Sequence, residues 1–316
     1  MFAARGIAVS FSVFVLMYCT LSLAVSFSWR IVWRRFQHHP VRRIADILFA
    51  LRMLPWLTAC VITAAFTIPS FLLLEPRAID EPLGGLPLSL GVCGAVLGIF
   101  GIVNAALALQ RASRTISRWA SQAEPMPSCG PVPVLRISQP VPAMTTAGIV
   151  RPKVLLSTVA EFLLTSNELQ TAMNHEIAHV RRRDNLKKLL LRLVTFPRMA
   201  GLEAAWIEAT EMAADDAAVL NAGEALDLAA ALLKLSRIRP IVPAIDLTTA
   251  LVLSPASVMN ARIERLIAWS DERLVPSRRS SAWFRLSAAL AAIAVCSITY
   301  SQLLVRVHAA TEWLVR

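Results

Sequence analysis

The sequence is poor in charged residues. Asp, Glu, Lys and Arg make up only 17% of its 316 residues, against about 25% in an average soluble domain. Hydrophobic residues make up 56%, and the mean hydropathy is +0.58. Hydrophobicity at this level excludes an intrinsically disordered chain, and so low a charge density excludes a histone-like nucleic-acid binder. We therefore expect a protein that lies partly in a lipid bilayer.

Paired cysteines are also missing. The five cysteines are odd in number and follow neither a CxxC spacing nor a Cys/His zinc-knuckle pattern, so the sequence predicts no disulfide framework. Four of them lie in long apolar stretches, where a thiol serves as a small packing side chain. The exception is Cys129.

Long uncharged runs are what the sequence has instead. Four stretches of about 20 residues or more lack every charged residue, and this length is enough for a helix to cross ~30 Å of hydrocarbon. They predict transmembrane helices at about residues 6–29, 53–74, 86–110 and 286–305. The first apolar stretch is too long for the hydrophobic region of a cleaved signal peptide, and only one basic residue precedes it.

Charges between these segments predict their orientation. Residues 30–52 hold six arginines and one aspartate, whereas residues 75–87 hold three acidic residues and one arginine. Because basic loops stay in the cytoplasm, we expect the N-terminus outside, residues 111–285 in the cytoplasm and the tail 306–316 outside. The net charge of +11 is then a positive-inside signature of a multi-pass protein in a bacterial-type inner membrane.

The segment 111–285 has the charge content of a folded aqueous domain, with 22 basic and 16 acidic residues. Short runs at 132–137 and 153–156 predict strands. Thr165 and Glu168 form a capping-box pattern that opens a helix toward Leu191, and further helices are expected at 204–220, 225–237 and 260–269. We predict a multi-span α-helical membrane protein whose mostly α, small-β domain lies between the third and fourth transmembrane helices.

An HExxH pattern stands in the capped helix, at His175, Glu176 and His179. Residues at i and i+4 share one helix face, so both imidazoles can bind one metal ion while the glutamate reaches its water. Chance alone gives such a pattern in a chain of this length with a probability on the order of 1%. No other histidine lies in 111–285.

A catalytic zinc site needs a third protein ligand. The metzincin extension is excluded, because Arg182 and Asn185 stand where its Gly and His would be. A carboxylate is therefore expected, with Cys129 a weaker alternative. Candidates on one face of the 204–220 helix are Glu208, Glu211 and Asp215, and their spacing does not choose between the two glutamates.

Three groups of residues resemble the BlaR/MecR family of membrane-embedded zinc metallopeptidases. They are TTAGIVRPKVLL at 145–156, NEL with HEIAHVRRRDN at 167–169 and 175–185, and EMAADDA at 211–217. The order of spans is also similar. The resemblance implies a gluzincin-like site with one Zn²⁺ per chain, held by His175, His179 and Glu211. It implies that Asp215 orients a ligand histidine, and it gives Asp184 a structural role.

The same resemblance implies peptide hydrolysis with Glu176 as the base. Thr145, Thr146 and Gly148 lie on a strand that either pairs with an extended substrate or packs only within the domain. The two tyrosines, Tyr18 and Tyr300, lie in apolar stretches. The oxyanion must then be stabilised by the metal or by an arginine such as Arg151.

The chain departs from β-lactam sensors of that family. Only 11 residues follow residue 305, where the sensors carry a penicillin-binding domain, and no SxxK motif occurs. The sequence leaves open whether the activating signal comes from a separate sensor subunit, from the short outside loop or from the state of the bilayer. It also leaves open whether the protein forms a homodimer. We expect a protein substrate, by analogy a BlaI/MecI-like winged-helix repressor.

Two other functions remain at this point. One is membrane-protein quality control of the HtpX kind, and the other is a non-catalytic membrane signalling scaffold, against which the intact Glu176 argues. The arginines at 181–183 lack interleaved aromatics, so we assign them to a solvated face or to anionic lipid rather than to direct nucleic-acid binding.

Overall fold

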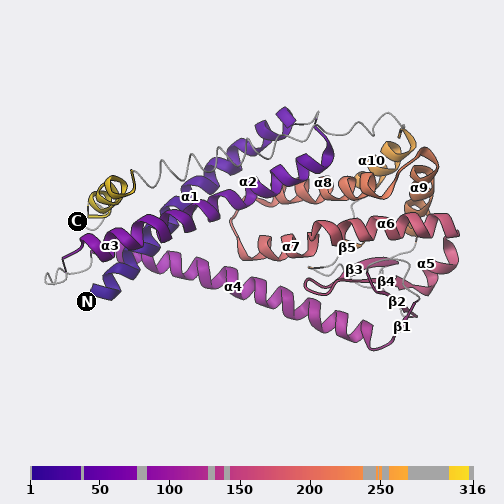
Figure 1. Cartoon of the computed structure of the whole chain (residues 1–316), viewed down its shortest axis with the longest axis horizontal. Coiled ribbons are helices and arrows are strands. Elements are labelled where there is room, and N and C mark those ends of the chain that lie inside the picture. The colour runs from indigo at the N-terminus through magenta and orange to yellow at the C-terminus, as the bar shows by residue number, and fades with distance from the viewer. Residues whose placement is uncertain are drawn as a thin grey trace.

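The structure is a computed structural model that describes residues 2–36, 39–76, 84–126, 132–138, 143–237, 247, 249–250, 256–269 and 299–312. It is elongated: long helices form one end, and the small sheet with shorter helices forms the other (Figure 1). Both labelled chain ends lie at the end formed by the long helices.

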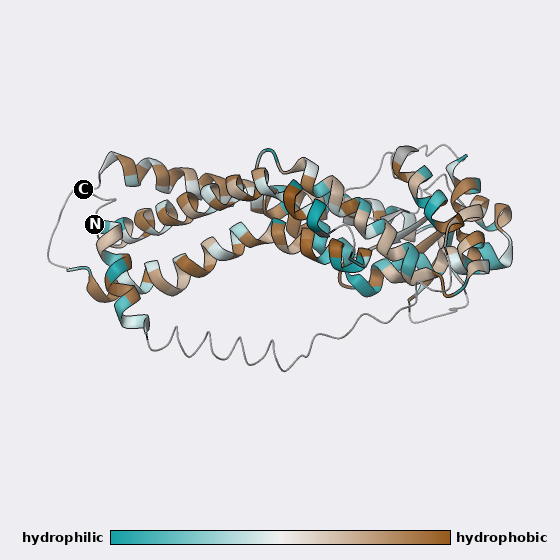
Figure 2. Ribbon diagram, turned by 90° about the horizontal axis from the view of Figure 1, so that it is seen from above, coloured by the Kyte–Doolittle hydropathy of each residue, from teal (hydrophilic) through white to brown (hydrophobic). Residues whose placement is uncertain are grey.

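Three helical segments are long and apolar enough to cross a membrane. They are α1 (Phe2–Phe36), α2 (Val41–Ile62) continued by the π-helix η1 (Thr63–Thr67) and α3 (Ile68–Leu74), and α4 (Gly85–Ala120). Hydrophobic residues predominate along these helices (Figure 2), and exposed side chains among them include Leu73, Ile99 and Phe100. This surface suits contact with lipid tails, and the chain is membrane-associated.

Three of the predicted spans lie within these helices. The expected boundary between residues 110 and 111 falls inside α4, which continues to Ala120. Most of the predicted fourth span, 286–305, lies outside the described residues. Its last part belongs to the helix at 299–312, where the Tyr300 hydroxyl donates a hydrogen bond to the Ala65 carbonyl at 2.8 Å.

Close contact between α1 and α4 depends on glycine. A Cβ atom on Gly94 would lie 2.7 Å from the carbonyl oxygen of Phe11, so a larger residue would push the two helices apart. Gly98, which completes a GxxxG pattern with Gly94, faces open space. In the described structure Gly94, and not the whole pattern, makes the contact.

The described residues include a five-stranded sheet in the order β1-β2-β4-β3-β5. The strands are β1 (Ala123–Pro125), β2 (Val134–Ile137), β3 (Met144–Ala147), β4 (Lys153–Ser157) and β5 (Thr249–Ala250). β2 and β4 run parallel, and the other pairs are antiparallel. The predicted strands 132–137 and 153–156 correspond to β2 and β4, and β3 lies inside the sheet.

Six helices accompany the sheet: α5 (Thr158–Leu163), α6 (Ser166–Arg182), α7 (Asp184–Leu193), α8 (Ala200–Ala218), α9 (Ala222–Ser236) and α10 (Ala256–Ile267). The capping box at Thr165 and Glu168 is present at the start of α6. The predicted continuous helix toward Leu191 is wrong, because Arg183 adopts a left-handed conformation (φ 54°) that ends α6 and starts α7. Nothing in the sequence marks this break, since no glycine or proline stands there.

Two hydrophobic cores meet at α8. One lies between the sheet, α6, α9 and α10 and includes Leu156, Leu228 and Ala218. The other packs α1 and α2 against the first half of α8 through Leu202 and Trp206. A buried arginine on α2, Arg52, strengthens this second contact: its Nε lies 3.0 Å from Oε1 of Glu203 on α8, and its Nη2 donates to the Val194 carbonyl after α7.

Candidate metal centre

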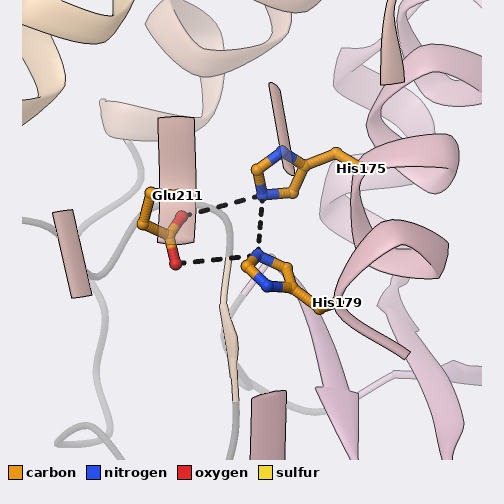
Figure 3. A group of neighbouring side chains, drawn as sticks. All are labelled: His175, His179 and Glu211. Atoms are coloured by element: carbon orange, nitrogen blue, oxygen red, sulfur yellow. Dashed lines mark hydrogen bonds and ion pairs between the residues drawn. The ribbon is translucent and has the colours of Figure 1, made fainter. Parts of the chain in front are cut away.

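α6 and α8 bring three potential metal ligands together (Figure 3). Nε2 of His175 lies 3.1 Å from Nε2 of His179, one helical turn further along α6. The carboxylate of Glu211 reaches across from α8, with its oxygens 3.7 Å from His175 Nε2 and 3.6 Å from His179 Nε2. All three residues are buried.

This donor set fits a zinc ion. Ligand atoms on a tetrahedral zinc with bonds of 2.0–2.1 Å are separated by roughly 3.3 Å, and the observed separations of 3.1, 3.6 and 3.7 Å bracket that value. Two imidazole nitrogens and a carboxylate are ligands that zinc prefers. His175, His179 and Glu211 would hold the ion and leave one position open.

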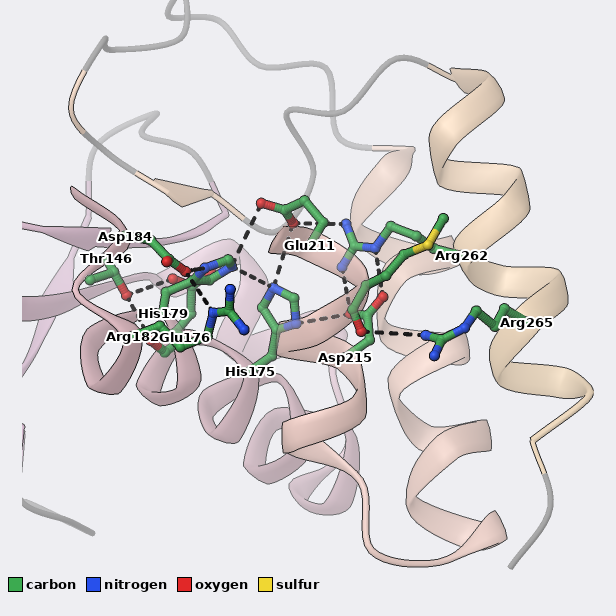
Figure 4. Close-up of polar contacts among 11 residues, drawn as sticks. Thr146, His175, Glu176, His179, Arg182, Asp184, Glu211, Asp215, Arg262 and Arg265 are labelled. Atoms are coloured by element: carbon green, nitrogen blue, oxygen red, sulfur yellow. Dashed lines mark hydrogen bonds and ion pairs between the residues drawn. The ribbon is translucent and has the colours of Figure 1, made fainter. Parts of the chain in front are cut away.

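Each histidine is held from behind by an aspartate (Figure 4). Nδ1 of His175 lies 2.9 Å from Oδ1 of Asp215, and Nδ1 of His179 lies 2.8 Å from Oδ2 of Asp184. A carboxylate at Nδ1 keeps the proton on that nitrogen, so the Nε2 lone pair points to the metal. Asp215 thus lies where the resemblance placed it, whereas Asp184 has a direct contact with a ligand that the sequence analysis did not foresee.

Arg262 on α10 organises the acidic side of the centre and is fully buried. It bonds Asp215 through Nε at 2.8 Å and Nη2 at 2.7 Å, and its Nη1 lies 3.1 Å from Oε2 of Glu211. Burial raises the pKa of Asp215, but the guanidinium outweighs burial and lowers it far below its usual range. Both carboxylates therefore stay charged.

Glu211 on α8 and His175 on α6 also shift each other's pKa. Burial raises the pKa of Glu211, but His179, His175 and Arg262 outweigh burial and lower it to about 2. Burial lowers the pKa of His175, but the carboxylates of Asp215 and Glu211 outweigh burial and raise it to about 9. A cation is thus favoured at this position, whether it is a proton or a metal ion.

Glu176 is buried on the same helix and is oriented by the sheet. Oγ1 of Thr146 donates a hydrogen bond of 2.6 Å to its Oε2. The other oxygen, Oε1, is also buried and has no hydrogen-bond partner within the described part of the chain. One oxygen is therefore fixed, and the other is free to accept a proton.

The structure places Thr145, Thr146 and Gly148 in and beside an inner strand. Thr145 and Thr146 are buried and pair with Ala250 and Thr249 of β5. Carbonyl oxygens of Thr146 and Gly148 accept hydrogen bonds of 3.2 and 3.1 Å from Nδ2 of Asn185. A substrate strand would have to replace β5 to pair here, so the role of these residues in substrate binding stays a prediction.

The other residues considered from the sequence lie apart from the ligands. Glu208 is half-buried and is not part of the ligand group that His175 and His179 form with Glu211. Arg151 is exposed. The Tyr18 hydroxyl donates to the Thr195 carbonyl between α7 and α8, and the Tyr300 hydroxyl donates to the Ala65 carbonyl. Cys129 lies outside the described residues.

Two cations near the centre escaped the sequence analysis. Arg262 lies about fifty positions after its partners Glu211 and Asp215 and belongs to no recognisable motif. Lys188 lies one turn after Asp184 on α7. Burial lowers its pKa and is the dominant effect, whereas the nearby carboxylates of Glu211, Asp184 and Glu176 raise it. Its spacing from Asp184 is the one signal that pointed to the site.

Comparison with known proteins agrees with this geometry. Residues 143–241 match the model of peptidase family M48. This segment is thus similar to peptidase M48 domains. It contains the HExxH helix, Thr146, Asp184, Glu211 and Asp215, and Arg262 lies beyond it. A search of curated proteins finds no match to the chain. The M48 match indicates a metallopeptidase, whereas the BlaR/MecR subfamily stays a prediction.

Proposed function

We propose that this protein is a membrane-embedded zinc endopeptidase that cleaves a protein in the cytoplasm. The observation that carries the proposal is the meeting of His175, His179 and Glu211 beside a buried glutamate, Glu176, with one unbonded oxygen. A structural metal site would not need such a base. The M48 match and the three apolar helices support a metallopeptidase at a membrane.

Zinc, when bound, supplies Lewis acidity that polarises the scissile carbonyl and acidifies water. The protein supplies the proton transfers. Glu176 takes a proton at Oε1 from the attacking water and returns it to the leaving amine, while Thr146 keeps Oε2 in place. Asp215 and Asp184 hold the two imidazoles in one orientation, so the centre needs little rearrangement during the reaction.

The substrate that we propose is a transcriptional repressor of the winged-helix BlaI/MecI kind. Its support is the resemblance of 143–219 and of the span order to the BlaR/MecR family, together with the basic loop at 30–52, which favours a cytoplasmic position for the centre. We further propose that the signal comes from a separate sensor subunit, from the short outside loop or from the state of the bilayer.

The test compares cells that carry the parent protein with cells that carry Glu176→Gln. We expect the variant to lose cleavage while it keeps about one zinc per chain, because Glu176 is not a ligand. The matched control is Glu264→Gln, which changes an exposed glutamate of α10 and should leave both properties intact.

Newly formed protein N-termini in these cells distinguish the functions. A single cleaved repressor in the parent strain supports the proposal. Many fragments of damaged membrane proteins would instead indicate quality control of the HtpX kind. Identical N-termini in parent and variant strains would overturn the enzymatic proposal and favour a non-catalytic scaffold.

A further inference from the structure

A second cluster of potential metal ligands lies at the opposite end of the molecule. It consists of Glu75, directly after α3, and of His308 and Glu312 on the helix at 299–312. Nε2 of His308 lies 3.8 Å from Oε2 of Glu75 and 3.5 Å from Oε1 of Glu312. α3 and the C-terminal helix meet there, far from α6 and α8 (Figure 1).

The cluster repeats the plan of the first centre. His308 and Glu312 stand at i and i+4 on one helix face, as His175 and His179 do, and a carboxylate from another element faces them. An arginine forms an ion pair with the carboxylate of Glu75: Nη1 of Arg5 lies 3.0 Å from its Oε1. The corresponding distance from Arg262 to Glu211 is 3.1 Å.

Burial distinguishes this cluster from a solvated acidic surface. The side chain of Glu75 is only 8% exposed and that of His308 only 15%, whereas Glu312 closes the cluster with 44% exposure. One oxygen of the buried Glu75 is taken by Arg5, and the other faces the imidazole. A buried carboxylate oxygen that faces a histidine is a favourable cation ligand.

The distances favour an ion between these groups over a direct ion pair. A charge-assisted N–H···O bond measures about 2.7–2.9 Å, and both separations from His308 Nε2, 3.5 and 3.8 Å, exceed it. They match instead the separations of 3.6 and 3.7 Å between Glu211 and the two histidines of the first centre. Two carboxylates against one guanidinium leave a net negative charge beside the imidazole, which favours a cation at this position.

We propose that Glu75, His308 and Glu312 bind a divalent transition-metal ion of the Zn²⁺ type and so fasten the C-terminal helix to the end of α3. The mixed imidazole and carboxylate set suits Zn²⁺ rather than Ca²⁺ or Mg²⁺. Nδ1 of His308 has no hydrogen-bond partner among the residues that the structure describes. Both histidines of the first centre have an aspartate at this position, so the second site binds more weakly and reversibly.

The test measures zinc binding by the full-length protein in detergent, without reference to activity. In a His175→Ala/His179→Ala background, which lacks the first centre, we expect one zinc per chain at saturation. His308→Ala in that background should abolish this binding. His39→Ala, which removes an exposed histidine elsewhere, is the matched control and should leave it unchanged.

A second variant guards against loss of folding. Glu312 is partly exposed, so Glu312→Gln should fold normally and weaken zinc binding at least about tenfold. Zinc binding that is unchanged in both His308→Ala and Glu312→Gln would overturn the proposal, and so would a background protein that binds no zinc. Equal zinc content in parent and background would instead count against the first centre alone, so the two assignments fail separately.

Discussion

Oγ1 of Thr146 donates a 2.6 Å hydrogen bond to Oε2 of Glu176, although the two residues are 30 positions apart in the chain. The bond joins the sheet to the base of the HExxH helix, and both groups are buried. A buried hydrogen bond to a charged carboxylate contributes about 1.5–3 kcal/mol. The bond therefore fixes one carboxylate oxygen of Glu176.

The first prediction concerns this bond. Thr146→Val keeps the shape of the side chain and removes the donor, so we expect kcat for peptide hydrolysis to fall about 10- to 100-fold with unchanged zinc content. Thr146→Ser keeps the hydroxyl and should retain most of the activity. Hydrolysis rates of a fluorogenic peptide that the parent cleaves provide the measurement. Equal rates for the valine and serine variants would show that the bond is not used.

The second prediction concerns Asp184, which lies 2.8 Å from Nδ1 of His179. Asp184→Asn removes the charge that holds the imidazole, and loss of such a partner lowers metal affinity about 10- to 100-fold. Competition with a chelator measures this change. Asp216→Asn is the matched control, because Asp216 pairs with Arg265 at the surface and should keep the affinity of the parent. A structural role alone would lower thermal stability and leave zinc affinity intact.

The third prediction concerns Arg262. Arg262→Met leaves Asp215 and Glu211 buried without their counter-charge, and loss of one partner of such a buried group costs about 3–5 kcal/mol. We expect a large fall in unfolding temperature. Arg262→Lys keeps the charge but loses the two-pronged contact with Asp215, so it should fold and bind zinc more weakly.

Arg265→Lys serves as the matched control for that pair. Arg265 lies one turn away from Arg262 on α10, where its partner Asp216 is 38% exposed, so its ion pair contributes less than about 1 kcal/mol. Unfolding temperature and zinc affinity should both stay near those of the parent. Equal effects of the two lysine variants would contradict the special role of Arg262.

The fourth prediction concerns pH. Burial raises the pKa of Glu168, but Lys234 and the capping-box bond to Thr165 outweigh burial and lower it. Because the folded-state pKa is depressed, the stabilisation is present above the usual pKa of Glu and is lost as pH falls through the folded value. Lys234→Met should lower the unfolding temperature by about 2–4 °C at pH 7.

That difference should shrink as pH falls below the usual range of a glutamate. Unfolding temperatures of parent and variant, measured from pH 7 down to about pH 3, provide the test. A difference that is the same at both ends of this range would show that Glu168 does not titrate with the pair. Lys234 is itself partly exposed, at 36%, which is why the expected shift is small.

Much of the centre could be predicted because its ligands follow helical spacing. His175, Glu176 and His179 lie close together because of their spacing on α6 alone. Glu211 and Asp215 share one face of α8. The sequence did not choose between Glu208 and Glu211, since that choice depends on how α8 rotates against α6. Packing of the alanine-rich part of α8 decides it.

The supporting contacts could not be predicted, because they come from distant parts of the chain. Thr146 reaches Glu176 only because β3 lies beside α6, and Arg262 reaches Asp215 only because α10 packs near α8. Asp184 meets His179 because Arg183 turns the chain with a left-handed residue. No glycine or proline signalled that turn, so an uninterrupted helix was expected.

The two cores that meet at α8 have a practical consequence. Leu202 and Trp206, on the same helix as Glu211, are buried against α2, and burial of each such side chain contributes about 1.5–3 kcal/mol. A soluble fragment cut near residue 111 would expose this face to water and leave the helix of a metal ligand half unsupported. We therefore expect a fragment without α1 and α2 to be unstable, and a change in the tilt of α2 would shift the helix that carries Glu211.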